Sequence, residues 1–178
     1  DYTNKNIISY AWSKGFTESL LPHEMAHLIF RDFIGFKGEV PLWLDEGVAQ
    51  WEEELKREKV KAAVRRLYNN NMLLYLEDMM QIDSRRLKKA EGIKVAQGAE
   101  GPVDPASLSE ESLVRTYYIQ AASLVGFLIE KYGSESFIYF CRQLRDGKDM
   151  DEALRFAYPN QAPDLETLEK KWRKSLLE

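Results

Sequence analysis

The sequence predicts a single α+β domain that is predominantly helical. Its 178 residues are close to the length of one domain. The last third carries apolar residues at the three- and four-residue spacing of amphipathic helices. One run, Ile7–Trp12, is rich in β-branched and aromatic residues and is closed by Gly15, as a short strand would be. We therefore expect a short N-terminal β element and a helical C-terminal part within one domain over residues 1–178.

Composition and charge argue against several classes of protein. Apolar residues make up 44% and charged residues 30% of the chain, so most of it is expected to fold. No apolar run approaches the roughly 18 residues that a membrane span requires. The formal net charge of −4 does not favour a nucleic-acid-binding protein, which usually has a basic face. We accordingly expect no nucleic-acid partner and no membrane span.

The cysteine count and the first residue bear on where the protein works. Cys141 is the only cysteine, which rules out an internal disulfide framework. The chain starts at Asp1 rather than at methionine, so we expect an excised or processed piece of a longer chain. Removal of an upstream signal or anchor would fit an extracytoplasmic location. The residues present leave the compartment and the oligomeric state open.

Two long helices are expected after the strand. Helical spacing covers residues 17–35 and ends at a glycine; Pro22 fits this helix only in its first turn, where no N–H is needed. After a loop over residues 35–41, one long charged helix is expected over residues 42–68, where three asparagines end it. Residues 72–83 are ambiguous between a helix and an irregular packed segment.

The second half of the chain is expected to be a loop followed by four helices. Residues 91–107 contain several glycines and prolines and few apolar residues, which is typical of a long surface loop. Capping residues and glycines bound the helices beyond it. The first helix runs from the capping pair Ser107 and Glu110 to Gly133, and the second runs from Ser134 to Leu144, before Gly147. The third begins at the capping pair Asp149 and Glu152 and ends before Pro159, and the last begins at Asp164.

The strongest functional signal is a His-Glu-x-x-His motif at residues 23–27. Residues four apart lie on the same face of a helix, so the imidazoles of His23 and His27 can reach one zinc ion. Glu24 lies to the side of that position, where it can take a proton from a zinc-activated water without being a ligand. The motif lies inside a periodic apolar helix, which is the context that this chemistry needs.

A catalytic zinc usually has three protein ligands, and the chain has no third histidine. The third ligand must then be a carboxylate or Cys141. The best carboxylate is Glu46, which follows His27 after eighteen intervening residues, at the start of the second expected helix. The loop over residues 35–41 is long enough to turn this helix back against the first. His23, His27 and Glu46 would then leave a fourth position open for water.

These motifs resemble those of the gluzincin metallopeptidases, in which His-Glu-x-x-His is followed eighteen residues later by glutamate. The surroundings are similar to the bacterial gluzincin-type domains of the peptidase MA superfamily, through Pro41–Ala49 and through Tyr118–Val125 leading to a Lys-Tyr-Gly sequence. The resemblance spans residues 7–176 and is specific at the two zinc-site motifs. It implies a zincin-like metallopeptidase fold, one zinc ion per chain, and substrate held along the strand Ile7–Trp12.

The resemblance also implies a donor near the oxyanion that forms during hydrolysis. With no spare histidine this donor is a tyrosine: Tyr118 first, by its match to the family helix, and Tyr117 second. One position departs from the pattern, because many gluzincins place an acidic residue four positions after the ligand glutamate, and here that residue is Gln50. An amide oxygen can still accept an imidazole N–H, or Asp45 or Glu53 can take that part.

The function expected from these residues is zinc-dependent hydrolysis of peptide bonds in a peptide or protein substrate, with Glu24 as the general base. The alternative is a zinc-binding gluzincin-like scaffold or interaction module with little or no turnover. The short chain, the nearly absent β region and Gln50 would suit that alternative. The sequence leaves open the cleavage preference and the choice between endopeptidase and aminopeptidase action.

Overall fold

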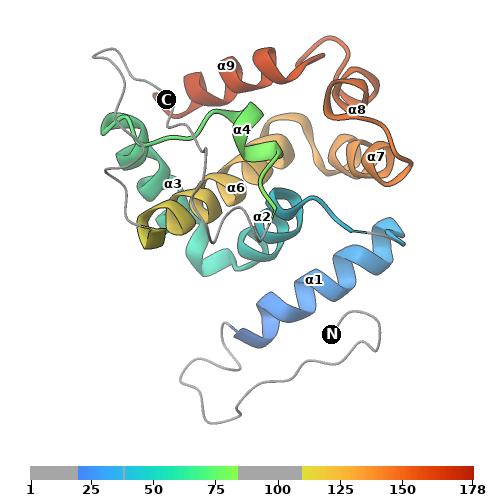
Figure 1. Cartoon of the computed structure of the whole chain (residues 1–178), viewed down its shortest axis with the longest axis horizontal. Helices are drawn as coiled ribbons and strands as arrows, with labels where there is room; N and C mark the ends of the chain where they lie inside the picture. Colours follow the sequence, from blue (N-terminus) through green and yellow to red (C-terminus); the bar gives the residue numbers. More distant parts are fainter. Residues whose placement is uncertain (1–19, 38, 84–109) are drawn as a thin grey trace.

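The computed structural model describes residues 20–37, 39–83 and 110–178, in which the regular elements are helices joined by short turns and loops (Figure 1). The prediction of a predominantly helical domain is confirmed, but the described residues contain no strand element that would support the β part of the α+β prediction. The expected strand Ile7–Trp12, the expected loop over residues 91–107 and the capping residue Ser107 lie outside them. The helices are α1 (Leu21–Ile34), α2 (Leu42–Glu52), α3 (Glu54–Asn69), α4 (Leu76–Met80), α6 (Glu110–Tyr132), α7 (Ser134–Arg145), α8 (Met150–Ala157) and α9 (Leu165–Ser175).

The core is built around α6, which lies in the middle of the molecule with α2 and α3 packed on it (Figure 1). Ala121, Leu124, Val125 and Leu128 on this helix are fully buried. The segment Ser112–Tyr132 is long and apolar enough to cross a membrane, which corrects the expectation that no such run exists. Because 61% of its apolar stretch is buried inside the structure, this segment serves as the core helix of the domain.

Local start and stop signals place several helix ends where the sequence predicts them. Pro22 lies in the first turn of α1. Gly35 ends α1 and Gly147 follows α7, with φ angles of 86° and 87° that glycine adopts without strain. Asp149 opens α8 with a complete capping box, and the side chain of Asp164 accepts a backbone N–H in the first turn of α9.

The single helix expected over residues 42–68 is in fact two helices, because the chain breaks at Glu53. The backbone of this residue (φ −74°, ψ 79°) leaves the helical region between α2 and α3. The surrounding glutamates and lysines have high helix propensity, so the sequence carries no signal for the break. In the folded chain the carboxylate of Glu53 faces His23 and is 8% exposed. Within the ambiguous residues 72–83, the short helix α4 forms.

Helix α2 lies directly against α6 because glycine removes a side chain at the points of closest approach. A Cβ atom on Gly47 would stand 2.7 Å from Cγ2 of Val125 and 2.8 Å from the backbone oxygen of Ala121. A Cβ atom on Gly126 would collide with the buried ring of Trp51. This close contact fixes the depth and rotation of α2, and therefore the positions of the two acidic residues that precede Gly47.

Among the described helices, α1 lies at the edge, against α2 and α7 (Figure 1). Its inner face buries Phe30 and Ile34, whereas Ile29 and Phe33 are 60% and 59% exposed on its outer face. One guanidinium nitrogen of Arg145, on α7, donates a 2.7 Å hydrogen bond to the backbone oxygen of Ile34. The C-terminal end of α1 is thereby joined to the helical part that follows α6.

The buried side chain of Gln120 joins α6 to the segment before α4. Its Oε1 accepts from the backbone N–H of Leu74 at 2.9 Å, and its Nε2 donates to the carbonyl oxygen of Leu74 at 2.8 Å. Both residues are 0% exposed. Water cannot replace these bonds, so the pair of contacts holds this segment in one register against the core helix.

We expect Gln120→Met to destabilise the fold by about 1–3 kcal/mol, because it leaves the Leu74 N–H buried without a partner. The carbonyl oxygen of Leu74 keeps a longer contact, 3.4 Å, with Arg173, so the N–H accounts for most of the loss. Urea unfolding followed by circular dichroism measures the change. The control is Gln161→Met at an exposed position; equal midpoints for the two variants would contradict the expectation.

Candidate metal centre

Helix α1 places the two histidines of the motif one turn apart, with both rings turned toward α2. The Nε2 atoms of His23 and His27 are 3.2 Å apart, and the rings meet edge to face with centroids 4.8 Å apart. The His27 side chain is 3% exposed and the His23 side chain 20% exposed. The four-residue spacing therefore brings both Nε2 atoms to one partly accessible point.

Helix α2 brings Glu46 to the same point, with Oε2 at 3.7 Å from Nε2 of His23 and 3.9 Å from Nε2 of His27. These three residues form a group able to hold a metal ion, with ligand atoms within 4.8 Å of one another. Donor atoms of a tetrahedral zinc site with bonds of about 2.0–2.2 Å stand about 3.3–3.6 Å apart, so the donor set fits zinc. Cys141, the other candidate ligand, is outside this group and fully buried on α7.

A carboxylate lies behind each imidazole ring, on the side away from this point. Oδ1 of Asp45 is 3.1 Å from Nδ1 of His27, and Oε1 of Glu53 is 3.5 Å from Nδ1 of His23. Arg31 lies 2.9 Å from the other oxygen of Asp45. Burial alone would raise the pKa of Asp45, but the bonds from His27 and Arg31 hold it below its usual value. Of the alternatives to an acidic residue at position 50, the structure thus places both Asp45 and Glu53 at the rings.

Burial and nearby charges move the pKa values of the three donors in different directions. Burial and repulsion from His27 lower the pKa of His23. Burial opposes charging of His27, but the hydrogen bond and the charge of Asp45 outweigh it and raise this pKa. Burial raises the pKa of Glu46, and with the charges of Asp45 and Glu24 it outweighs the opposing charge of His27.

Glu24 lies beside the donor set on α1 and is half-buried. It follows His23 directly, so its side chain leaves the helix about 100° around the axis from that imidazole. It is not part of the group that can hold the metal. Its negative charge nevertheless acts on the pKa values of His23, His27 and Glu46. Glu24 is therefore close enough to act electrostatically on the three donors, and its role as general base stays a prediction.

Tyr117 and Tyr118, on α6, both lie within electrostatic reach of Glu46. Burial, followed by the charge of Glu46, raises the pKa of each hydroxyl. Tyr117 is fully buried and its hydroxyl has no partner among the described residues, whereas Tyr118 is half-buried. Tyr118 is therefore the more accessible of the two, and the oxyanion role that the resemblance implies stays a prediction for Tyr118 first and Tyr117 second.

For the peptide hydrolysis that the motif residues predict, we expect Tyr118→Phe to lower kcat by roughly 10²–10³-fold with little change in KM, because only the developing oxyanion would use the donor. Tyr117→Phe is the matched control, since it removes a hydroxyl from the adjacent buried position. Steady-state kinetics on the two variants tests the assignment. A larger loss of kcat in Tyr117→Phe would transfer the role to that residue.

Sequence reasoning missed Arg31, which forms part of the site through Asp45. The available signal was its position four residues after His27, one turn further along the same face of α1. The role of a cationic side chain at this position can be explained only once Asp45 is known to face His27. That fact depends on the rotation of α2, which spacing along the chain does not give.

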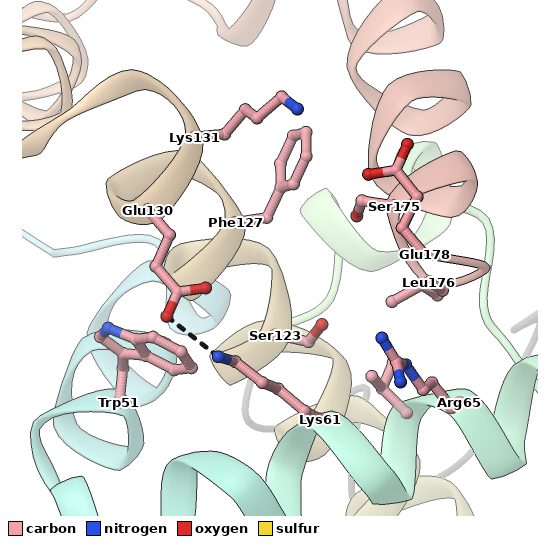
Figure 2. A pocket seen from close by; sticks show the side chains of 11 residues that line it. Trp51, Lys61, Arg65, Ser123, Phe127, Glu130, Lys131, Ser175, Leu176 and Glu178 are labelled. Carbon is pink, nitrogen blue, oxygen red and sulfur yellow. Dashed lines mark hydrogen bonds and ion pairs between the residues drawn. The ribbon is translucent and has the colours of Figure 1, made fainter.

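A separate cavity of 280 Å³ lies between α3, α6 and the C-terminal end of the described chain (Figure 2). Trp51 and Phe127 form apolar parts of the cavity wall. Nζ of Lys61 lies 3.1 Å from Oε1 of Glu130 across the cavity. The pair is largely exposed, so it adds little to stability. None of the donor residues lines this cavity. The motif residues therefore lie in a different site, between α1 and α2.

No protein-family model, curated protein or solved structure matches this chain. The gluzincin family and the zincin-like fold therefore stay predictions that rest on the motif residues. The described residues define a helical domain in which α1 and α2 bring two imidazoles and a carboxylate to one point, with a further carboxylate behind each ring.

Proposed function

We propose that the protein is a zinc-dependent peptidase. The observation that carries this proposal is the set of distances of 3.2, 3.7 and 3.9 Å among the donor atoms of His23, His27 and Glu46. Two imidazoles and one carboxylate form a ligand class of catalytic zinc, which leaves one position open. Zinc bound there supplies a Lewis acid that polarises a carbonyl group and lowers the pKa of water toward about 7.

Two side chains near this position, Glu24 and Tyr118, have separate roles in the proposed reaction. Glu24 accepts a proton from the attacking water and then delivers it to the nitrogen of the leaving amine. Tyr118 donates its O–H to the former carbonyl oxygen while negative charge builds there. The peptide bond is cleaved by one water, which gives a carboxylate and an amine. The substrate is a peptide or a protein, and each chain uses one zinc ion.

The scaffold alternative drew part of its support from Gln50, which gives no negative charge to a ligand histidine. Asp45 and Glu53 supply such charges at 3.1 and 3.5 Å from the two rings. The donor set, the adjacent Glu24 and these carboxylates are the parts that hydrolysis needs. For this reason peptide hydrolysis is the better proposal.

The first test is the zinc content of the purified protein, measured by elemental mass spectrometry before chelation and after zinc is added back. We expect about one zinc per chain, and we expect His23→Ala to lose it because one of the three donors is removed. Glu135→Ala, at an exposed position on α7, is the control. Absence of stoichiometric zinc after add-back, with no thermal stabilisation, would overturn the proposed function.

Cleavage of a generic unfolded protein separates the peptidase from the scaffold. We expect cleavage by the zinc-loaded protein that stops when a chelator is added and returns when zinc is restored. Stoichiometric zinc without such cleavage would support the scaffold instead. Comparison with His23→Ala protein purified by the same procedure excludes a contaminating protease.

A further inference from the structure

The two carboxylates behind the imidazoles differ in burial and in the cation that accompanies each. We infer that Asp45 and Glu53 are positioning residues that turn both Nε2 atoms toward the metal, and that Asp45 contributes the larger share of zinc affinity. This inference rests on the proposed function, because it concerns the same site. It adds two residues that touch neither the metal position nor substrate.

The His27 side of the site is a closed arrangement between α1 and α2. Arg31 and His27 lie one turn apart on α1, and Asp45 reaches across from α2 to contact both. The side chains of His27 and Asp45 are 3% and 7% exposed, and that of Arg31 is 22% exposed. Low exposure keeps water from screening these charges, so each contact is stronger than it would be at the surface. Asp45 is therefore held in place from both sides.

The His23 side of the site is more open. Oε1 of Glu53 is 3.5 Å from Nδ1 of His23, and its other oxygen pairs with Lys56, whose side chain is 47% exposed. The His23 ring is 20% exposed. The distance is longer than the 3.1 Å on the His27 side, and solvent reaches two of the three groups. Glu53 should accordingly constrain its imidazole less than Asp45 does.

A carboxylate at Nδ1 acts on the metal through the ring. It accepts a hydrogen bond from the Nδ1–H group, which fixes the tautomer with a free lone pair on Nε2, limits ring rotation and makes Nε2 a better metal ligand. Helix α2 thus carries one ligand, Glu46, and next to it the residue that orients another, His27. The break in the helix after α2 places Glu53 beside His23. Loss of either carboxylate should weaken zinc binding while every ligand remains present.

Competition with a chromophoric chelator on the full chain measures zinc affinity directly. We expect roughly 10–100-fold weaker binding for Asp45→Asn, a smaller loss of several-fold for Glu53→Gln, and unchanged affinity for Glu52→Gln. Glu52 is exposed and adjacent to Glu53, so this control removes the same charge without touching a ring. Circular dichroism and thermal unfolding of the metal-free proteins establish that each variant is folded, which separates lost positioning from lost structure.

Asp45→Asn could fail to fold, because it leaves Arg31 without its buried partner. Arg31→Gln then tests the same side of the site, and we expect it to weaken zinc binding more than Glu53→Gln does. Wild-type affinity in folded Asp45→Asn or Arg31→Gln, or a larger loss in Glu53→Gln, would overturn the inference while zinc binding by the wild type keeps the proposed function. A wild type that binds no zinc would overturn both.

Discussion

Glu24→Gln should retain zinc and lose hydrolysis. Glutamine has nearly the shape of glutamate but cannot accept a proton from water, so the general-base step is removed and the ligands are kept. We expect kcat to fall by roughly 10²–10⁴-fold with about one zinc per chain still bound. Zinc content and chelator-sensitive cleavage are measured on the same preparation.

The matched control is Glu52→Gln, which makes the same chemical change at an exposed position on α2. It should cleave at the wild-type rate. Equal rates for wild type and Glu24→Gln would show that another group activates the water. Loss of zinc in Glu24→Gln would show instead that Glu24 belongs to the ligand set.

Gly47→Ala should strongly destabilise the described core. Its Cβ would stand 2.7 Å from Val125 and 2.8 Å from the backbone oxygen of Ala121, and a backbone atom of a central helix moves only with the whole helix. We expect a loss of about 3 kcal/mol, at the upper end for overpacking, even though alanine favours a helix over glycine by about 1 kcal/mol. Urea unfolding measures the loss.

The same substitution should also weaken zinc binding, because moving α2 outward displaces Glu46 and Asp45 together. Leu168→Ala is the comparison, because it opens a cavity in the core on α9, whose main helix contacts are with α4 and α8. We expect both variants to be destabilised, and only Gly47→Ala to bind zinc more weakly than wild type. Equal zinc affinities in the two variants would mean that the spacing of α2 and α6 does not control the site.

Helix ends were the most predictable part of the fold, because their causes are local. Gly35, Gly147, Asp149 and Asp164 each act within one turn of the chain, so the sequence contains the whole cause. The break at Glu53 has no such local cause. It lies in a run of residues that favour a helix, and the contacts that accompany it come from α1.

The donor set could be predicted from the sequence, whereas its surroundings could not. The spacing of His23 and His27 fixes their common face, and a returning second helix suffices to bring Glu46 near them. Which carboxylate faces which ring depends on the rotation of α2, and this is set by contacts such as those of Gly47 with α6. Sequence reasoning therefore left Gln50, Asp45 and Glu53 as alternatives, and Arg31 was missed.

In the proposed zinc protein, the position of α1 at the edge of the described helices would tie metal occupancy to local unfolding. This one helix carries both histidines and the base, while Glu46 is fixed on α2 against the core. Opening of α1 away from α2 would dismantle the site without disturbing α6, so the closed helix and the intact site are one thermodynamic state. Zinc at about 100 times its dissociation constant would stabilise that state by about 2.7 kcal/mol. The concentration of free zinc would thereby set how long the backbone amides of α1 resist exchange with solvent.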